Sequence, residues 1–181
     1  TIAAQGNITV DNTSFNGSAL LLINGTGDQT FTGSATQTAG NLPKVDINKA
    51  SGTLTLSGTL RIVSDWTWTA GTVSAGTSTV VFAPDNGITQ TITGSHTLAN
   101  VTLDPNRFSG TYNLTIAYGT TLTVSGTLLL DNTDVASMGI NTGTIAAQGN
   151  VTTTSEVSTA GTAAVQLTGE NNQTITIVNV P

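Results

Sequence analysis

Two stretches of the chain share one ten-residue pattern: TLTLSGTLRI at residues 53–62 and TLTVSGTLLL at residues 121–130. They differ at three of the ten positions. In both, leucine or valine alternates with threonine, which is the period of a β-strand with one buried face. Ser57-Gly58 and Ser125-Gly126 interrupt the alternation, and glycine supplies the backbone freedom that a corner between strands needs. The pattern predicts short strands joined by tight bends.

The composition favours an all-β protein with uncharged polar surfaces. Only 8% of the 181 residues are charged, whereas threonine and serine fill 52 positions. Leucine, isoleucine and valine recur in register, so the chain does not have the composition of a disordered segment. No apolar run of about 18 residues is present, and no basic-then-apolar leader opens the chain. We therefore expect no membrane-spanning helix, and we expect any secretion signal to lie outside these residues.

The charged residues argue against two classes of partner. The four basic residues, Lys44, Lys49, Arg61 and Arg107, are too few and too scattered to neutralise a phosphate backbone, so nucleic-acid binding is not expected. A net charge of -6 argues against an anionic membrane surface. There is no cysteine, so strand pairing and the core must stabilise the fold without disulfides. Low lysine and high threonine suggest an extracellular or cell-surface location.

The chain contains a long internal repeat. TIAAQGNI at residues 1–8 returns as TIAAQGNV at residues 144–151, and Gln29-Thr30 aligns with Gln173-Thr174. Residues 1–143 therefore form one full period, and residues 144–181 begin the next, continuous with the first. A shorter repeat lies inside the period, because QTFTGS at residues 29–34 recurs as QTITGS at residues 90–95.

Two all-β architectures fit this organisation. The first is a parallel β-solenoid with coils of roughly 20 residues, about seven to a period, each adding about 4.8 Å of height. The second is a row of tandem β-sandwich domains. Short strands, recurrent Gly-Thr and Ser-Gly corners and few aromatic residues favour the solenoid, and no stretch has a helical period. The solenoid predicts an inward row made of Leu54, Leu56, Leu60 and Ile62 and an equivalent row made of Leu122, Val124, Leu128 and Leu130.

Three longer stretches carry a resemblance to a known class of protein. They are WTWTAGTVSAGTSTVVF (66–82), QTITGSHTLANVTL (90–103) and LTIAYGTTLTVSGTLLL (114–130). These resemble the repeats of β-strand-repeat or filamentous-haemagglutinin-like, autotransporter-like bacterial surface proteins. The resemblance implies a long stalk or fibre, with any binding activity often elsewhere in the polypeptide.

The residue inventory provides no catalytic or metal-binding cluster. His96 is the only histidine. Without a second histidine or a cysteine it cannot form an ordinary zinc site, and without a well-placed acid it cannot form a Ser-His-Asp triad. We expect it to be exposed or to lie in a turn. Asp131 and Asp134 are the closest acidic pair, and Asx turns explain them better than calcium binding or catalysis does. We predict no enzyme activity, no cofactor and no metal.

Two features suggest ligand binding in place of a purely structural role. Trp66 and Trp68 point to the same side of a strand, so an exposed pair could stack on sugar rings, whereas a buried pair would be core. Thr-x-Thr triplets recur along the chain and could form an ice-binding array if they lay on one flat face, although outward threonines give the same pattern. Such triplets include Thr30/Thr32, Thr53/Thr55, Thr67/Thr69, Thr77/Thr79, Thr91/Thr93 and Thr121/Thr123.

Both ends of the chain have strand-like alternation instead of a polar cap. The residues concerned are Ile2, Ile8 and Val10 at one end and Ile175, Ile177 and Val178 at the other. Solenoids protect their terminal coils with caps, and uncapped strand edges add further strands. We expect a non-catalytic stalk, fibre or filament segment whose partners are further copies or repeats of itself. The alternatives are a carbohydrate-binding adhesin surface at the tryptophans, which would bind surface polysaccharide, and an ice-binding threonine array.

Overall fold

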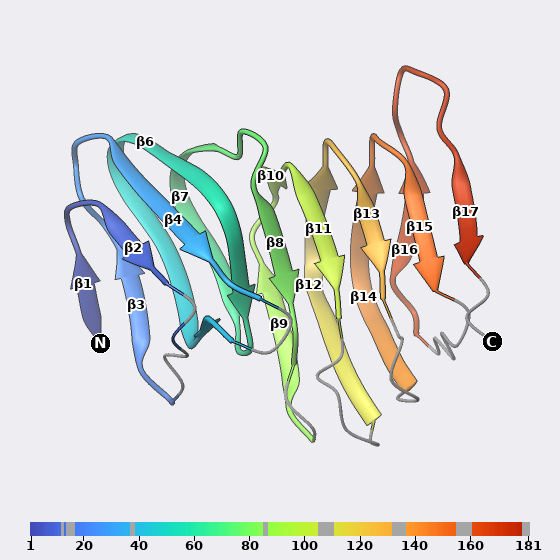
Figure 1. Cartoon of the computed structure of the whole chain (residues 1–181), viewed down its shortest axis with the longest axis horizontal. Coiled ribbons are helices and arrows are strands. Elements are labelled where there is room, and N and C mark those ends of the chain that lie inside the picture. The colour runs from blue at the N-terminus through green and yellow to red at the C-terminus, as the bar shows by residue number, and fades with distance from the viewer. Residues whose placement is uncertain are drawn as a thin grey trace.

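The computed structural model describes residues 1–11, 13, 17–36, 39–84, 87–104, 111–131, 137–154 and 161–178, apart from the side chains of residues 111, 137 and 138. These residues form 17 β-strands and no helix, and therefore no helix long and apolar enough to cross a membrane. The strands stack in parallel as a β-solenoid of about six turns, with coils of roughly 23 residues. Figure 1 shows the turns following one another from the N-terminal to the C-terminal end. The prediction of a parallel solenoid is confirmed, with coils slightly longer than expected.

Hydrogen-bonded pairing, together with the order of strands along each coil, divides the coils into three ladders. Ladder I contains β1 (Ile2–Ala4), β3 (Leu20–Ile23), the start of β6 (Lys44–Ile62), the start of β7 (Trp66–Ser74), β9 (Thr89–Thr93), the start of β12 (Thr111–Val124) and the start of β14 (Ser137–Ala147). Ladder II contains β2 (Ile8–Val10), β4 (Gln29–Ser34), the middle of β6, the end of β7, β10 (His96–Leu98), the ends of β12 and β14, and β16 (Ala164–Leu167). Ladder III contains β5 (Asn41–Leu42), the end of β6, β8 (Thr79–Phe82), β11 (Asn100–Leu103), β13 (Leu128–Leu130), β15 (Val151–Thr154) and β17 (Ile175–Val178).

The alternating pattern produces the expected core. Leu54, Leu56, Leu60 and Ile62 are buried, and so are Leu122, Val124 and Leu128, while Leu130 is half-buried. At Gly58 the chain of β6 passes from ladder II to ladder III with a φ of 69°, in the left-handed region that glycine tolerates. A Cβ at this position would collide with the carbonyl oxygen of Gly33 in the preceding coil. The bend predicted at Ser57-Gly58 is therefore a corner of the solenoid.

The long sequence repeat is not a whole number of turns. From β1 to β14, ladder I contains six successive pairings, and hence six turns. Yet β1 lies on ladder I, whereas its counterpart in the second copy, residues 145–147, pairs on ladder II. In the same way β2 lies on ladder II, and its counterpart β15 lies on ladder III. One period therefore takes six turns plus one ladder.

Candidate functional site

The C-terminal end of the solenoid exposes the apolar side chains of its last coil. β16 pairs with β14, and β17 pairs with β15. The exposed fractions are 57% for Ile175, 73% for Ile177 and 42% for Val178, and Val165 and Leu167 are similarly open. All three C-terminal residues that the sequence assigned to an assembly edge are therefore accessible.

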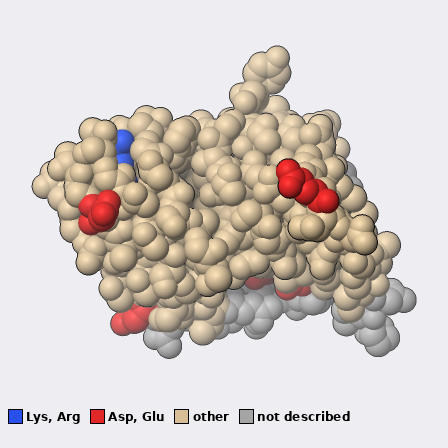
Figure 2. Space-filling view, turned by 90° about the horizontal axis from the view of Figure 1, so that it is seen from above, with Lys and Arg blue, Asp and Glu red and all other residues tan. Residues whose placement is uncertain are grey.

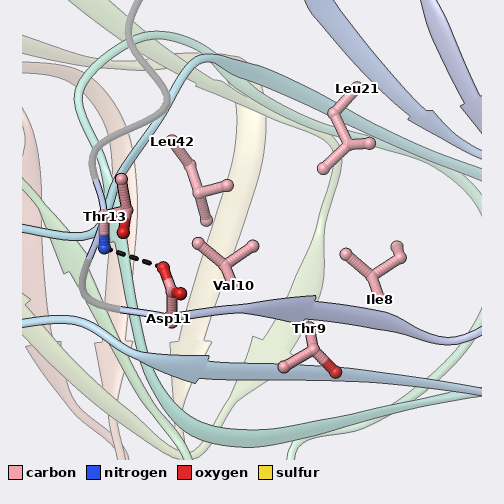
Figure 3. Close-up of a pocket in the computed structure, with 7 residues that line it drawn as sticks. All are labelled: Ile8, Thr9, Val10, Asp11, Thr13, Leu21 and Leu42. Carbon is pink, nitrogen blue, oxygen red and sulfur yellow. Dashed lines mark hydrogen bonds between the residues drawn. The ribbon is translucent and has the colours of Figure 1, made fainter.

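The N-terminal end opens into a pocket of about 400 Å³ (Figure 3). Ile8 and Val10 point from β2 toward Leu21 and Leu42, so much of the pocket wall is apolar. Ile8 and Val10 are half-buried, whereas Ile2 in β1 is 45% exposed. At the rim, the backbone N–H of Thr13 donates to Asp11 Oδ1 at 2.9 Å, and this hydrogen bond lowers the pKa of the Asp11 carboxyl. The two ends of the solenoid thus leave parts of the core uncovered.

Three glutamines hold successive coils together at the corners, through an interaction we name the corner clasp. In each, the side-chain Nε2 donates to two carbonyl oxygens of the preceding coil, two residues apart in the sequence. Gln29 reaches Ala4 and Gly6, Gln90 reaches Ile62 and Ser64, and Gln173 reaches Ala147 and Gly149. In each clasp the first carbonyl oxygen also accepts a backbone N–H, from Asn24, Ala83 or Thr168, so the glutamine adds a second hydrogen bond to it and one to the carbonyl two residues further on.

A second hydrogen bond completes each corner clasp. The residue after each glutamine is a threonine, and its N–H donates to an Asn or Asp side chain of the preceding coil. Thr30 donates to Asn7, Thr91 to Asp65 and Thr174 to Asn150, at 2.9 Å in all three. These clasps lie at the corner between ladders I and II, between III and I, and between II and III respectively. The recurrence of Gln-Thr was visible in the sequence, but its meaning depends on which carbonyl groups lie opposite.

Lys49 takes the place of the glutamine in the third coil. Its Nζ donates to the carbonyl oxygens of Gly25 and Gly27 at 2.5 and 2.9 Å and to Gln29 Oε1 at 2.7 Å. The side chain is 1% exposed, and none of these three partners is a carboxylate. A buried ammonium is stable only where hydrogen-bond acceptors replace water, and three oxygens match its three N–H groups. Lys49 is therefore a structural residue, linking the corner of one coil to the corner clasp of Gln29.

A buried ion pair crosses the outer side of ladder III. Arg61 Nη1 lies 2.9 Å from Asp104 Oδ2, and Arg61 Nε donates to Asn41 Oδ1 at 3.0 Å. The guanidinium is 1% exposed although its strand position points outward. The pair borders a small pocket of about 190 Å³ that Asp131 also lines. This arrangement connects three coils and accounts for a residue that the sequence analysis treated only as a scattered charge.

The tryptophan pair belongs largely to the core, which is one of the two alternatives left open by the sequence. Trp66 is fully buried, with its ring edge-on to Phe82 at a centroid distance of 6.2 Å. Because it is buried, Trp66 offers no face to a sugar ring. Trp68 is half-buried, and its Nε1 donates to the Gly71 carbonyl oxygen. Only Trp68 retains accessible ring surface.

His96 is neither exposed nor in a turn, contrary to the expectation from the sequence. It lies in β10, half-buried, and stacks against Trp66 and Trp68 at centroid distances of 6.2 and 6.3 Å. Its Nε2 accepts from Trp66 Nε1 at 2.9 Å, and its Nδ1 lies 2.7 Å from the Gly94 carbonyl oxygen. The network assigns the neutral tautomer protonated at Nδ1. Burial lowers the pKa of His96, and the hydrogen bond to Gly94 partly opposes that shift.

The remaining candidate residues do not gather into one site. The Thr-x-Thr triplets are distributed over three ladders, and the row through Thr97 and Thr123 ends at Ala146, so they form no single regular grid. Asp131 Oδ1 accepts a long hydrogen bond of 3.3 Å from Thr154, and Asp134 lies outside the described residues. Within the part of the chain that the structure describes, no three His, Cys, Asp or Glu residues form a potential metal site. On the face drawn in Figure 2, the acidic side chains lie in a few separate patches among uncharged residues.

Comparison of the chain with protein-family models, curated proteins and solved structures gave no match. The resemblance to bacterial surface repeats, and the role that it implies, stay predictions. The open ends and the corner clasps are therefore the features from which a function can be argued.

Proposed function

We propose that this chain is a structural, non-catalytic segment of an extracellular repeat protein, stacked into part of a stalk, fibre or filament. The observation that carries the proposal is the pair of open ends. Ile2 at one end and Ile175, Ile177 and Val178 at the other are each at least 42% exposed, in strands with ladder partners on one side. Strand edges of this kind add further strands, and a contact between unlike ends does not close on itself. Further coils, from neighbouring repeats or other copies, are the partners.

The interior supports a load-transmitting role. Parallel ladders connect successive coils through backbone hydrogen bonds, and the three corner clasps add side-chain hydrogen bonds between some of them. The non-catalytic part of the proposal rests on the residue inventory, with one histidine and no cysteine. The extracellular location rests on the low lysine content and on the resemblance of the sequence to surface repeats.

Sedimentation velocity of the purified chain over a wide concentration range tests assembly through the ends. We expect a sedimentation coefficient that rises with concentration, and elongated particles in electron micrographs. Ile177→Lys places a charge on the exposed C-terminal edge and should reduce association. Thr97→Lys, at an exposed position in the interior coil of β10, is the matched control and should not. A compact monomer at every concentration contradicts self-assembly of this chain.

A further inference from the structure

The chain itself shows what covers the strands of its N-terminal end. The heptapeptide TIAAQGN occurs at residues 1–7 and again at residues 144–150. In the second copy a preceding coil, residues 121–130, lies directly against it. Leu122 pairs with Ile145, Val124 with Ala147 and Leu128 with Val151. Under that coil Ile145 and Ala147 are fully buried and Val151 is 6% exposed.

The N-terminal copy has the same residues without such a coil. Ile2, the counterpart of Ile145, is 45% exposed. Ile8, the counterpart of Val151, lines the 400 Å³ pocket. The pocket therefore lies at the position where the second copy receives Leu128.

The opposite end lacks a coil of the same type. β16 and β17 are the counterparts of β3 and β4, which are covered by β6 with Gln29 opposite Leu54 and Phe31 opposite Leu56. Phe31 is fully buried, whereas its counterpart Ile175 is 57% exposed. The missing neighbour at this end corresponds to β6, whose residues 44–47 cover β3 and whose residues 54–59 cover β4. At the other end it corresponds to residues 121–130, TLTVSGTLLL.

We infer that the N-terminal edge, made of β1, β2 and the pocket, is a docking surface for a coil of sequence type TLT-x-SGTL. This inference rests on the proposed function, in which the ends join further coils, and it names the coil and its register. The second residue of the pattern packs on Ile2, and the eighth enters the pocket beside Ile8. The backbone bonds follow the interior copy, where Gln148 N–H donates to the Val124 carbonyl and Leu128 N–H to the Asn150 carbonyl. The incoming coil comes from another period of the same sequence.

Direct stacking of two identical 181-residue chains gives a less complementary contact than docking of a TLT-x-SGTL coil on the N-terminal edge. It would place β16 and β17 of one copy against β1 and β2 of the next. Within the chain a coil of the β1–β2 type always precedes a coil of the β3–β4 type, and the reverse order does not occur among the described coils. The coil that precedes the second β1–β2 type coil is of the TLT-x-SGTL type.

A longer chain tests this docking directly. Residues 111–143 are placed before Thr1, so that the order of segments around the second copy is reproduced at the first. The expected results are a higher melting temperature and at least a tenfold slowing of hydrogen exchange at the β1 and β2 amides. The matched control has the same extension with Leu122→Asp and Leu128→Asp in the added coil, and it should give no such protection. Equal protection by both extensions overturns the inference.

A substitution at Ile2 provides a second readout in the same molecules. Ile2→Asp should change the melting temperature little in the 181-residue chain and lower it strongly in the extended chain, because only there is the side chain covered. An equally small change in both chains overturns the inference. Both measurements are intramolecular, so a 181-residue chain that stays monomeric counts against self-assembly and leaves the docking result standing.

Discussion

The two copies of TIAAQGN are the same peptide in two environments. In the interior copy Ile145 is fully buried and Ala146 is 8% exposed, whereas in the N-terminal copy Ile2 is 45% exposed and Ala3 is exposed as well. Both copies form strands in parallel ladders. The difference between them is the preceding coil. Burial in this fold is therefore a property of neighbouring coils and not of the strand sequence, as expected for a structure in which each repeat contacts only its neighbours.

The largest expected effect comes from placing a charge in each copy. Ile145→Asp would bury a carboxylate without a partner, which costs several kcal/mol, on the order of 3–5 kcal/mol for an uncompensated buried charge. Ile2→Asp can leave its carboxylate in water and should cost less than about 1 kcal/mol. Urea denaturation of both variants measures the difference. Equal losses would show that the two copies are equally buried in solution.

Replacing the clasping glutamines should have a smaller effect, and here the N-terminal copy should lose more stability than the interior copy. Gln29 clasps the corner of the N-terminal copy and also accepts from Lys49, whereas Gln173 clasps the corner of the interior copy and accepts from Gly169 N–H. In Gln29→Leu the Ala4 carbonyl still accepts from Asn24 N–H, but the Gly6 carbonyl and the buried Lys49 ammonium lose this partner, at about 1–3 kcal/mol for each group left unsatisfied. Gln173 is half-buried, so water can replace part of its bonding in Gln173→Leu. Thermal denaturation should therefore rank Gln29→Leu as the more harmful change, and the reverse ranking would contradict the role given to Lys49.

Acid should affect the middle of the solenoid, where neither copy lies. Burial keeps the pKa of His96 below its ordinary value of 6.5, so the unfolded chain binds more protons than the folded chain just below pH 6.5. The contribution of neutral His96 to the free energy of unfolding is fully present above about pH 6.5 and is lost as the pH falls toward the pKa of the folded state. Below that pKa the free energy of unfolding no longer changes with the titration of His96. Protonated Nε2 would also face the Trp66 N–H donor.

Melting temperatures between pH 8 and pH 5 measure this effect of His96, above the range in which most carboxyls titrate. His96→Gln should be less stable than the unsubstituted chain at pH 8. Its melting temperature should also change much less between pH 8 and pH 5. A slope that persists in this variant would assign the titration to another group.

The smallest expected effect is that of metal removal. Stacking between coils orders both copies, and no cluster of three acidic or histidine residues exists among those described. The melting temperature should therefore be the same with and without EDTA. A fall of ten degrees or more would show that a bound ion, with Asp131 as a ligand, stabilises the coils.

The fold was predictable from the sequence because its signal is local. Alternation in residues 53–62 depends only on which side chains face inward, so Leu54, Leu56 and Leu60 were placed correctly. The bend at Gly58 was also visible, because few other residues tolerate its φ. Coil length was underestimated, because paired residues are 19 apart at Ile2 and Leu21 but 26 apart at Tyr112 and Met138. Corners of varying length leave no fixed period.

The candidate site was less predictable, because its interactions join residues from different coils. Gln29 reaches carbonyl groups more than twenty residues earlier in the chain, and a backbone carbonyl has no sequence signature. His96 was misplaced for the same reason. Its environment is set by Trp66, thirty residues away, and a single histidine between serine and threonine is typical of a surface turn. The uncapped ends were visible in the sequence, since their residues keep a strand alternation.

The shift of one ladder per period gives any longer array a screw symmetry. Each period of six turns and one ladder advances about 30 Å along the axis at about 4.8 Å per turn. It also rotates the next period about the solenoid axis, so that each strand moves from its ladder to the following one. Tyr118, 96% exposed, occurs once in the period, so its copies would wind around the axis with a pitch of about 90 Å, three periods long. A fibre of this kind presents every surface feature in all directions, without a front or a back.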